Sequence, residues 1–579
     1  MPKPFTRWIS LIPFAFLSPV LAQSPLDDYS PVTLAELQDP PPEDWLMWRR
    51  TPDNWGYSPL DQINRSNVAN LRLAFAWTME PGMQETTPLI HDGVMFLPQA
   101  CDFIEAIDAT DGTLLWEYRR PPVEHIAPLS CANRNATLYQ DQLIIATRDA
   151  YLVSLDARTG EVTWERKMGE WTVGQHYSGG PQVFDGKIIA GMSGCYYINT
   201  GCWITAHNAD TGEELWRTNT VPMIGEPGGE TWGDVPNEQR RGGSAWMPAS
   251  YDAELNLIFV GVAVPIPWGE IQRNTKGGDV LYTNSTLALN ADTGAIEWYF
   301  QHIPGDNWDQ DHPFARLVVE TEVTPRAEDV TWINPAISSS ARRKVLTGIP
   351  GKPGIVWTLD AATGEFLWAK ETNYQNVLIG VDIPNRKGIT NPNIFPAEIS
   401  QEHLVCPTTR GGINWQSVGY SPQTNTLYAP TNNACMTFAL NAVEHELGDY
   451  HSSARSRIVE PPDFDGQVGI FSAVDVATGK ARWTHHQRAG IGGSVLTTGG
   501  GLVFVTDDAR RLRAFDADNG DILWEQILNS TAGGYPVTYM VDGVQYLAIA
   551  AGGGVTYRML TPELRQRGGG NMLFVFRLP

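Results

Sequence analysis

The chain has 579 residues, of which 42% are hydrophobic, so it can bury a large core. Its 55 Gly, 41 Pro and 21 Trp favour many short strands joined by turns over a helical bundle. The 65 acidic and 41 basic residues give a net charge of −24, and no cluster of Lys or Arg stands out, which argues against a nucleic acid as partner.

The N-terminus has the pattern of a secretory signal peptide, which we assign to residues 1–22. Lys3 and Arg7 supply the positive start, residues 9–17 are apolar, and small residues precede the cleavage site. An uncleaved anchor is the alternative, but the apolar run is shorter than the roughly 20 residues that a spanning helix needs. We therefore expect a mature, exported chain of residues 23–579 without a membrane span, placed in the periplasm.

A pattern of the form A-x-D-x-x-T-G-x-x-x-W occurs seven times with small variations. Each copy predicts an alternating strand, a tight turn and a second alternating strand. We expect a positive φ at the turn glycines, which are Gly112, Gly160, Gly212, Gly294, Gly364, Gly479 and Gly520. The copies end at Trp116, Trp164, Trp216, Trp298, Trp368, Trp483 and Trp524. A large ring at one fixed place in each repeat predicts a stapling role and not a ligand contact.

The spacing of the repeats predicts an all-β, eight-bladed β-propeller with Trp-docking motifs, formed as a single domain. Successive Trp residues lie 48, 52, 82, 70, 115 and 41 residues apart, which brackets the size of a four-stranded blade. The longest interval has room for an extra blade, which we place at residues 426–441. We expect residues 45–77 to pair with the final strand at 572–578, so that no sheet edge stays open.

The six cysteines are an even number in an exported chain, which favours disulfides over metal thiolates. Fifteen pairings are possible in principle. We predict Cys101–Cys131, Cys195–Cys202 and Cys406–Cys435, because each pair lies close in sequence or on adjacent strands of one presumed blade. No C-x-x-C-H segment occurs, so covalently attached c-type haem is not expected in this chain.

A propeller alone does not specify a function, but two short segments do point to one. They are Asn307-Trp308-Asp309 and Asn414-Trp415-Gln416. Together with the repeats they resemble the quinoprotein alcohol dehydrogenases, from about Trp45 to the C-terminus. Within that family, GCWITAHNADTGEELWR, GDNWDQD and ETNYQN resemble the sorbose and sorbosone dehydrogenase branch, which includes enzymes that oxidise the trichothecene deoxynivalenol. The resemblance implies pyrroloquinoline quinone (PQQ) as cofactor.

PQQ is a flat tricarboxylate, so its site needs a planar surface to stack on, cations and hydroxyl groups. By the resemblance, Trp246 is the stacking floor, and Arg134 and Lys352 are the cations near the carboxylates and the quinone. The other matches are Ser178, Ser193 and Gly194 beside the rings, Glu85 at the pyrrole side, and Asn414 and Trp415 on the far wall. The alternatives are a blade staple for Trp246, solvated charges for the two cations, and ordinary packing for the others.

Asp309 matches the family's catalytic base, which removes the hydroxyl proton of the alcohol. Asp311 would lie on the same side of an extended segment, so both carboxylates could bind one calcium or lanthanide ion. The alternative for Asp311 is an ordinary turn residue. Two departures weaken this metal site: Cys195-Tyr196 stands where the family has a calcium-binding Glu, and Val264 stands where it has an Asn.

The sequence also departs from the family above the quinone, because it has no Cys-Cys dipeptide. An altered roof is compatible with a wider mouth for polyols, sugars or bulky cyclic alcohols; the alternative is that loops close it again. We predict a PQQ-dependent dehydrogenase, a monomer or homodimer, that passes electrons to a soluble cytochrome c or similar acceptor. The negative charge fits a basic redox partner or simple solubility. The alternative is a non-catalytic propeller scaffold that binds proteins in the cell envelope, although no Cys for a lipid anchor follows the apolar run.

Overall fold

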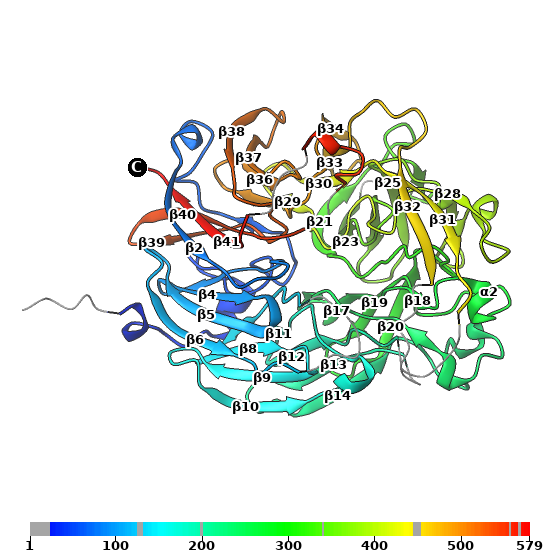
Figure 1. Cartoon of the computed structure of the whole chain (residues 1–579), viewed down its shortest axis with the longest axis horizontal. Coiled ribbons are helices and arrows are strands. Elements are labelled where there is room, and N and C mark those ends of the chain that lie inside the picture. The colour runs from blue at the N-terminus through cyan, green and yellow to red at the C-terminus, as the bar shows by residue number, and fades with distance from the viewer. Residues whose placement is uncertain are drawn as a thin grey trace, which may run out of the picture.

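The computed structural model describes residues 24–123, 131–196, 201–337, 341–443, 453–554, 557–564 and 569–579. The predicted signal peptide lies outside these residues. Ten sheets are formed in the described parts, and eight of them have four or more strands. Those eight follow one another around a ring in chain order (Figure 1). The chain is thus an all-β propeller.

Seven of these sheets each contain one Trp-ended repeat. The first four are built from β3 (Leu89–His91), β4 (Val94–Gln99), β5 (Phe103–Asp108) and β6 (Leu114–Arg119); β7 (Thr137–Tyr139), β8 (Gln142–Ala146), β9 (Tyr151–Asp156) and β10 (Val162–Lys167); β11 (Gln182–Phe184), β12 (Lys187–Gly191), β13 (Trp203–Asn208) and β14 (Glu214–Asn219); and β16 (Ser250–Asp252), β17 (Leu257–Gly261), β19 (Ser285–Asn290) and β20 (Ile296–Gln301). The next three are built from β21 (Leu317–Val323), β23 (Ala341–Gly348), β24 (Ile355–Asp360) and β25 (Phe366–Glu371); β29 (Gly419–Ser421), β30 (Thr426–Asn432), β33 (Gly469–Asp475) and β34 (Ala481–Gln487); and β35 (Leu496–Thr498), β36 (Leu502–Thr506), β37 (Arg511–Asp516) and β38 (Ile522–Ile527).

Shorter elements are added to this ring. Two of the sheets gain outer strands, namely β26 (Leu378–Asp382) with β27 (Lys387–Thr390), and β22 (Trp332–Ile333). The parallel β1 (Tyr57–Ser58) is added to a third sheet at its inner edge, beside β35. Two small sheets lie apart, β15 (Arg241–Gly242) with β18 (Pro265–Ile266), and β28 (His403–Val405) with β31 (Cys435–Leu440) and β32 (Ala454–Val459). The α-helices among the described residues are α1 (Leu34–Gln38) and α2 (Glu270–Arg273).

The Trp residues of the repeats fasten each sheet to the next one along the chain. All seven turn glycines have a φ between 71° and 83°, as predicted. A Cβ added to Gly160 would lie only 2.6 Å from the Trp116 ring, and Gly212, Gly294, Gly364 and Gly520 meet Trp164, Trp216, Trp298 and Trp483 in the same way. At Gly479 the added Cβ would meet Val330 first, at 2.3 Å, and the Trp368 ring at 3.3 Å. The glycine is therefore needed both for the turn and for the close approach of the indole.

The ring closes through a sheet without a repeat, made of β2 (Arg72–Thr78), β41 (Met572–Arg577), β40 (Val544–Ala551) and β39 (Val537–Val541). The antiparallel pairing of β2 with β41 confirms the predicted closure. Phenylalanine replaces tryptophan in this sheet: Phe75 lies against Gly112, and Trp524 of the preceding sheet meets Phe576 at a ring-centroid distance of 5.4 Å.

The extra blade predicted at residues 426–441 is not formed. The strand β30 belongs to the sheet that carries Trp483, while β31 lies in the small sheet with β28 and β32. Both segments do form strands, but the long interval holds an insertion and not a further four-stranded unit. Alternation of side chains predicts a strand without specifying its partner, so this error could not be seen from the pattern.

The centre of the ring is tied together by the segment before β1. The Arg49 side chain is fully buried and donates hydrogen bonds to the backbone oxygens of Val418 and Val495, at 2.8 and 2.6 Å. The Trp55 indole donates to the oxygen of Val318 at 2.6 Å. These contacts link three different sheets, so the N-terminal segment supports the ring from inside.

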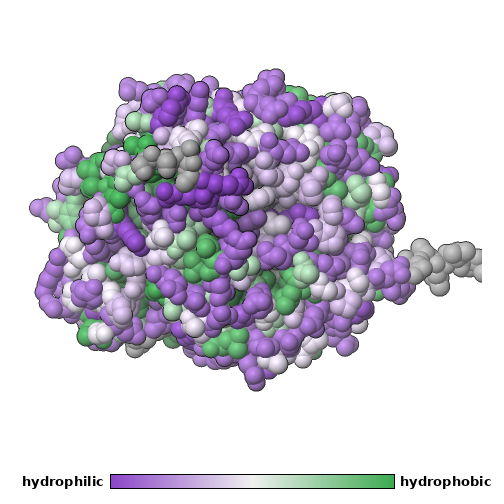
Figure 2. Space-filling view, turned by 180° about the vertical axis from the view of Figure 1, so that it is seen from behind, coloured by the Kyte–Doolittle hydropathy of each residue, from purple (hydrophilic) through white to green (hydrophobic). Residues whose placement is uncertain are grey.

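The surface behind the view of Figure 1 is mostly hydrophilic, with scattered hydrophobic side chains between (Figure 2). This fits the high proportion of acidic residues. None of the helices in the described residues is long and apolar enough to cross a membrane.

Candidate active site

The predicted site residues lie at one end of the ring. The first strand of each sheet is nearest the centre, since β7 contacts β11, β16 contacts β21, and β29 contacts β35. Most predicted residues directly precede such a strand, while Ser193, Gly194 and Lys352 lie in the loops after β12 and β23 that reach the same end. The full set is Glu85, Arg134, Ser178, Ser193, Gly194, Trp246, Asp309, Asp311, Lys352, Asn414 and Trp415.

Two carboxylates and one ammonium group form the first cluster. The Nζ atom of Lys352 lies 2.9 Å from Oδ2 of Asp309 and 3.0 Å from Oδ2 of Asp311. The side chain of Lys352 is 5% exposed, and those of Asp309 and Asp311 are 14% and 12% exposed. The two carboxylates therefore meet at one point, as expected. The segment is not extended, however, because Asp309 has a φ of 61° in a tight turn.

Burial and charge act against each other in this cluster. Burial raises the pKa of Asp309 well above its usual range, Lys352 lowers it in part, and the Asp311 carboxylate raises it again. Burial disfavours the charged form of Lys352, but the two carboxylates outweigh it and raise the pKa of the ammonium group. Lys352 is thus firmly cationic, while Asp309 is a carboxylate with increased affinity for a proton.

The second cluster is centred on Arg134. Its guanidinium pairs with the carboxylate of Glu85, which is 2% exposed, and donates to the backbone oxygen of Ser178 at 3.0 Å. It lies 4.8 Å from the ring centroid of Trp246 and 5.8 Å from that of Trp415. Burial raises the pKa of Glu85, and Arg134 opposes that rise. One buried cation thus lies between two indole rings.

Three of the remaining predicted residues have well-defined places. The hydroxyls of Ser178 and Ser193 lie 3.4 Å apart. Gly194 has a φ of 71°, and a Cβ there would come within 2.1 Å of the Gly174 oxygen, so only glycine fits. The backbone N–H of Asn414 donates to the Gln416 side-chain oxygen at 2.9 Å, whereas no described contact joins the Asn414 side chain to either cluster.

The two clusters belong to one site, because short contacts connect them. The backbone N–H of Val264 donates to Oδ1 of Asp311 at 3.2 Å, and the Val264 oxygen accepts from Gly243, three residues before Trp246. The rings of Trp246 and Phe314 meet at 5.5 Å, and Phe314 follows Asp311 by three residues. The structure brings Asp309, Asp311 and Lys352 together with Arg134 and the two indoles.

The structure joins the six cysteines in the three predicted disulfides, Cys101–Cys131, Cys195–Cys202 and Cys406–Cys435. The Cys195–Cys202 bond directly follows Gly194, so the position of the family's Glu is occupied by a disulfide. Val264 donates its backbone N–H to Asp311, and its side chain has no oxygen that could bind a metal ion. Within the described residues no three His, Cys, Asp or Glu side chains gather as a metal-binding group. The side chains that could bind a cation here are therefore the two carboxylates of Asp309 and Asp311.

Two residues that contact the site were not singled out in the sequence. Phe314 packs against Trp246, and the Tyr535 hydroxyl donates to the backbone oxygen of Trp415 at 3.0 Å. Tyr535 is fully buried, and its ring meets Trp48 at 5.4 Å. Neither lies in a repeat or a recognisable motif, and Tyr535 is 120 residues from its partner. No local pattern could have identified them.

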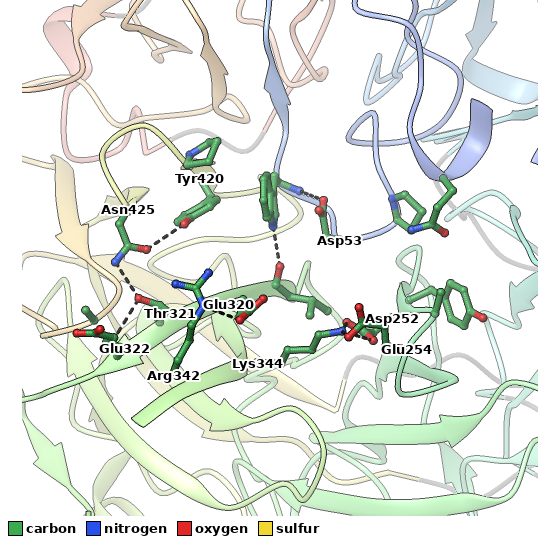
Figure 3. Close-up of a pocket in the computed structure, with 18 residues that line it drawn as sticks. Asp53, Asp252, Glu254, Glu320, Thr321, Glu322, Arg342, Lys344, Tyr420 and Asn425 are labelled. Atoms are coloured by element: carbon green, nitrogen blue, oxygen red, sulfur yellow. Dashed lines mark hydrogen bonds and ion pairs between the residues drawn. The ribbon is translucent and has the colours of Figure 1, made fainter. Parts of the chain in front are cut away.

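A large pocket of about 750 Å³ lies at the other end of the ring, near the ends of β16 and β21 (Figure 3). Its cations are already paired: Lys344 bridges Asp252 and Glu254 at 2.8 and 2.7 Å, and Arg342 pairs with Glu320 at 2.6 Å. None of the predicted site residues lines it. Pocket size alone therefore does not locate the predicted chemistry.

Comparison with known proteins agrees with the fold. Residues 45–374 and 463–547, more than half of the chain, match the PQQ family "Glucose/ethanol/alcohol dehydrogenase, beta-propeller domain". The quinoprotein alcohol dehydrogenase PedH of Pseudomonas putida is 31% identical over 558 residues, which cover 90% of this chain and 89% of that protein.

Solved structures show the same likeness. The quinohemoprotein alcohol dehydrogenase ADHIIG of Pseudomonas putida HK5 has a TM-score of 0.85 at 29% identity, covering 95% of this chain and 82% of that one. A europium-containing methanol dehydrogenase has a TM-score of 0.83 at 26% identity, covering 94% and 100%. PQQ with calcium or a lanthanide is the typical cofactor set of such proteins. The chain therefore belongs to the family of PQQ-dependent alcohol dehydrogenases, oxidoreductases built on a β-propeller.

Proposed function

We propose that this protein is a PQQ-dependent dehydrogenase that oxidises primary or secondary hydroxyl groups of polyols, sugars or bulky cyclic alcohols. The observation that carries the proposal is the pairing of Asp309 with Lys352 in the same site as Arg134 between two indoles. A poised carboxylate, a fixed ammonium and a cationic, aromatic surface are what the oxidation of an alcohol by a flat, anionic quinone requires.

The site fits PQQ, because buried groups around Arg134 lack partners of their own. Nε of Arg134 and both polar side-chain atoms of Asn133 are buried without a hydrogen bond in the described part of the chain. Carboxylates of PQQ would accept from the N–H groups of Arg134 and of the Asn133 amide, and Trp246 would stack on its rings. When bound, PQQ supplies the acceptor for the hydride of the alcohol.

The proton chemistry falls to Asp309. Its raised pKa makes the carboxylate a better acceptor for the hydroxyl proton, and Lys352 holds it in place and keeps it ionised. Asp309 and Asp311 would also bind the calcium or lanthanide ion, with the cofactor and not Cys195 or Val264 completing the shell. Glu85, Ser178, Ser193, Gly194, Asn414 and Trp415 would line the cofactor.

The cation Lys352 gives a test of this assignment. Without its charge, the pKa of Asp309 rises further, so Asp309 stays protonated to a higher pH. For Lys352→Met we expect the acidic limb of the pH profile of kcat/KM to move to higher pH. Lys344→Met is the matched control, because Lys344 also bridges two carboxylates but lies at the other end of the ring. An unchanged profile for Lys352→Met would show that the two groups do not act together.

The substrate class rests on the sequence segments that resemble the sorbose and sorbosone dehydrogenase branch, and deoxynivalenol is a candidate within it. The absence of adjacent cysteines is consistent with a wide mouth. We further propose that the eight large sheets are the eight blades of one domain, residues 23–579. Export to the periplasm through residues 1–22, a monomeric or homodimeric state, and electron transfer to an external cytochrome c complete the proposal.

Reconstitution of the purified apo-protein tests the function. The protein is titrated with PQQ plus calcium or a light lanthanide, and dye reduction is followed with sorbose, simple alcohols and deoxynivalenol. We expect stoichiometric PQQ uptake and faster turnover of the bulky substrates than of methanol or ethanol. PQQ uptake with activity on simple alcohols alone would reject the substrate class. No uptake with either metal would reject the enzyme and favour a scaffold.

A further inference from the structure

The turn that presents Asp309 is organised by a third carboxylate, Asp306, which is 1% exposed. Oδ1 of Asp306 accepts the backbone N–H of Trp308 at 2.7 Å. Oδ2 accepts the backbone N–H of Gln310 at 2.7 Å and the Asn284 side-chain amide at 3.0 Å. The two backbone donors belong to the residues on either side of Asp309, so Asp306 fixes the peptide units that flank it.

This arrangement explains the unusual backbone of Asp309. Its φ of 61° is uncommon for a residue with a Cβ and persists only where the surroundings hold it. Three donors converge on the two oxygens of Asp306, and the carboxylate has no salt-bridge partner among the described residues within bonding distance. A buried anion that accepts three hydrogen bonds is well suited to hold a strained turn.

Neighbouring groups hold the same turn from other sides. The Asn284 amide also donates to the backbone oxygen of Gln310 at 2.9 Å. The fully buried Gln310 side chain donates to the backbone oxygen of Thr408 at 3.2 Å. The Arg273 guanidinium donates to the backbone oxygen of Asp306 at 3.0 Å. Asn284 is itself fully buried with a φ of 51°, which suits asparagine. The turn is thus fixed to several separate elements.

We propose that Asp306, supported by Asn284, is a positioning residue that holds the Asp309 carboxylate on Lys352. Its effect on turnover rests on the proposed function, whereas its effect on the place of Asp309 does not. The residue would therefore affect the base through the geometry of the turn.

The test is Asp306→Asn, which keeps the shape of the side chain but leaves one acceptor oxygen for three donors. We expect kcat to fall about 100-fold, as for a misplaced catalytic group, with KM and PQQ affinity changed by less than about threefold. In a crystal structure of the apo-variant, Asp309 should leave the left-handed region and separate from Lys352.

Asp360→Asn is the matched control. Oδ1 of Asp360 accepts the backbone N–H groups of Ala362 and Thr363 at 3.1 and 3.0 Å in an outer turn. Two other repeats have asparagine at this position, where Asn208 makes the same contacts. We expect kcat, KM and the pH profile of this variant to stay within about twofold of the parent protein, since one acceptor oxygen suffices there.

A second variant guards against a folding defect in Asp306→Asn. Asn284→Gly removes the supporting amide, and glycine tolerates the positive φ, so we expect a smaller loss of kcat with an unchanged pH profile. The proposal is overturned if Asp306→Asn keeps kcat within about twofold, or if its loss merely follows the fraction of protein that binds PQQ, or if Asp309 keeps its backbone conformation and its contact with Lys352 in the apo-variant. A parent protein that takes up PQQ but oxidises no alcohol would reject the proposed function instead, and the apo-structures would still test the positioning.

Discussion

Replacing Asp309 with Asn is expected to lower kcat by about 10²- to 10⁴-fold, the range contributed by a positioned general base. Asparagine has the same shape and can still contact Lys352, but it cannot accept the hydroxyl proton. The affinity for PQQ should fall far less than kcat, because the direct contacts proposed for the cofactor come mainly from Arg134 and Trp246, and Asp309 would reach it only through the metal ion. The measurement is steady-state dye reduction at saturating PQQ, together with a PQQ titration.

Asp111→Asn provides the control for this prediction. Asp111 is exposed in the turn of the first repeat, where its carboxylate accepts the N–H of Thr113 at 2.8 Å. The substitution removes one negative charge without touching the site, so turnover should equal that of the parent protein. If Asp309→Asn retained substantial turnover, the base would have to be another group.

Replacing Arg134 with Met is expected to have the largest effect on stability. The Glu85 carboxylate would stay buried without its cation, which costs about 3–5 kcal/mol for a broken buried pair. PQQ affinity should also fall, because hydrogen bonds to a charged group contribute roughly 1.5–3 kcal/mol. Urea unfolding and a PQQ titration measure the two effects.

The pH dependence of this loss distinguishes the broken ion pair from lost packing. Burial raises the pKa of Glu85 and Arg134 lowers it, so the pKa rises further in Arg134→Met. The folded variant then binds a proton more tightly than the unfolded chain, and its stability decreases as pH rises. The loss should therefore be greater near pH 7 than near pH 5. Glu85→Gln combined with Arg134→Met should recover part of it, whereas a pH-independent loss would reject the ion-pair explanation.

Much of the fold was predictable because the repeat is local. Within one repeat the sequence contains the strand, the turn glycine and the Trp, and the same residues make the contact to the next sheet, as for Trp116 with Gly160. Pairing between distant segments was harder. The pairing of β2 with β41 follows from the need to cover sheet edges. The sequence pattern predicts a separate blade around β30, whereas this strand belongs to the sheet that contains Trp483.

The site was predictable only through resemblance, since its residues come from loops of several sheets. The resemblance supplied Arg134, Asp309 and Lys352, and the structure brings them to one end of the ring. Residues that act through backbone groups escaped it. Asp306 lies in the same short motif as Asp309. The hydrogen bonds that it accepts from the backbone of Trp308 and Gln310 depend on the positive φ of Asp309, which no sequence pattern predicts.

A crystal structure of the PQQ-loaded protein tests the central claim most directly. We expect the quinone at the end of the ring that contains Asp309 and Lys352, stacked on Trp246, with a carboxylate on Arg134. Density for PQQ in the pocket lined by Lys344 and Arg342, or at any place out of contact with Arg134 and Trp246, would contradict the account.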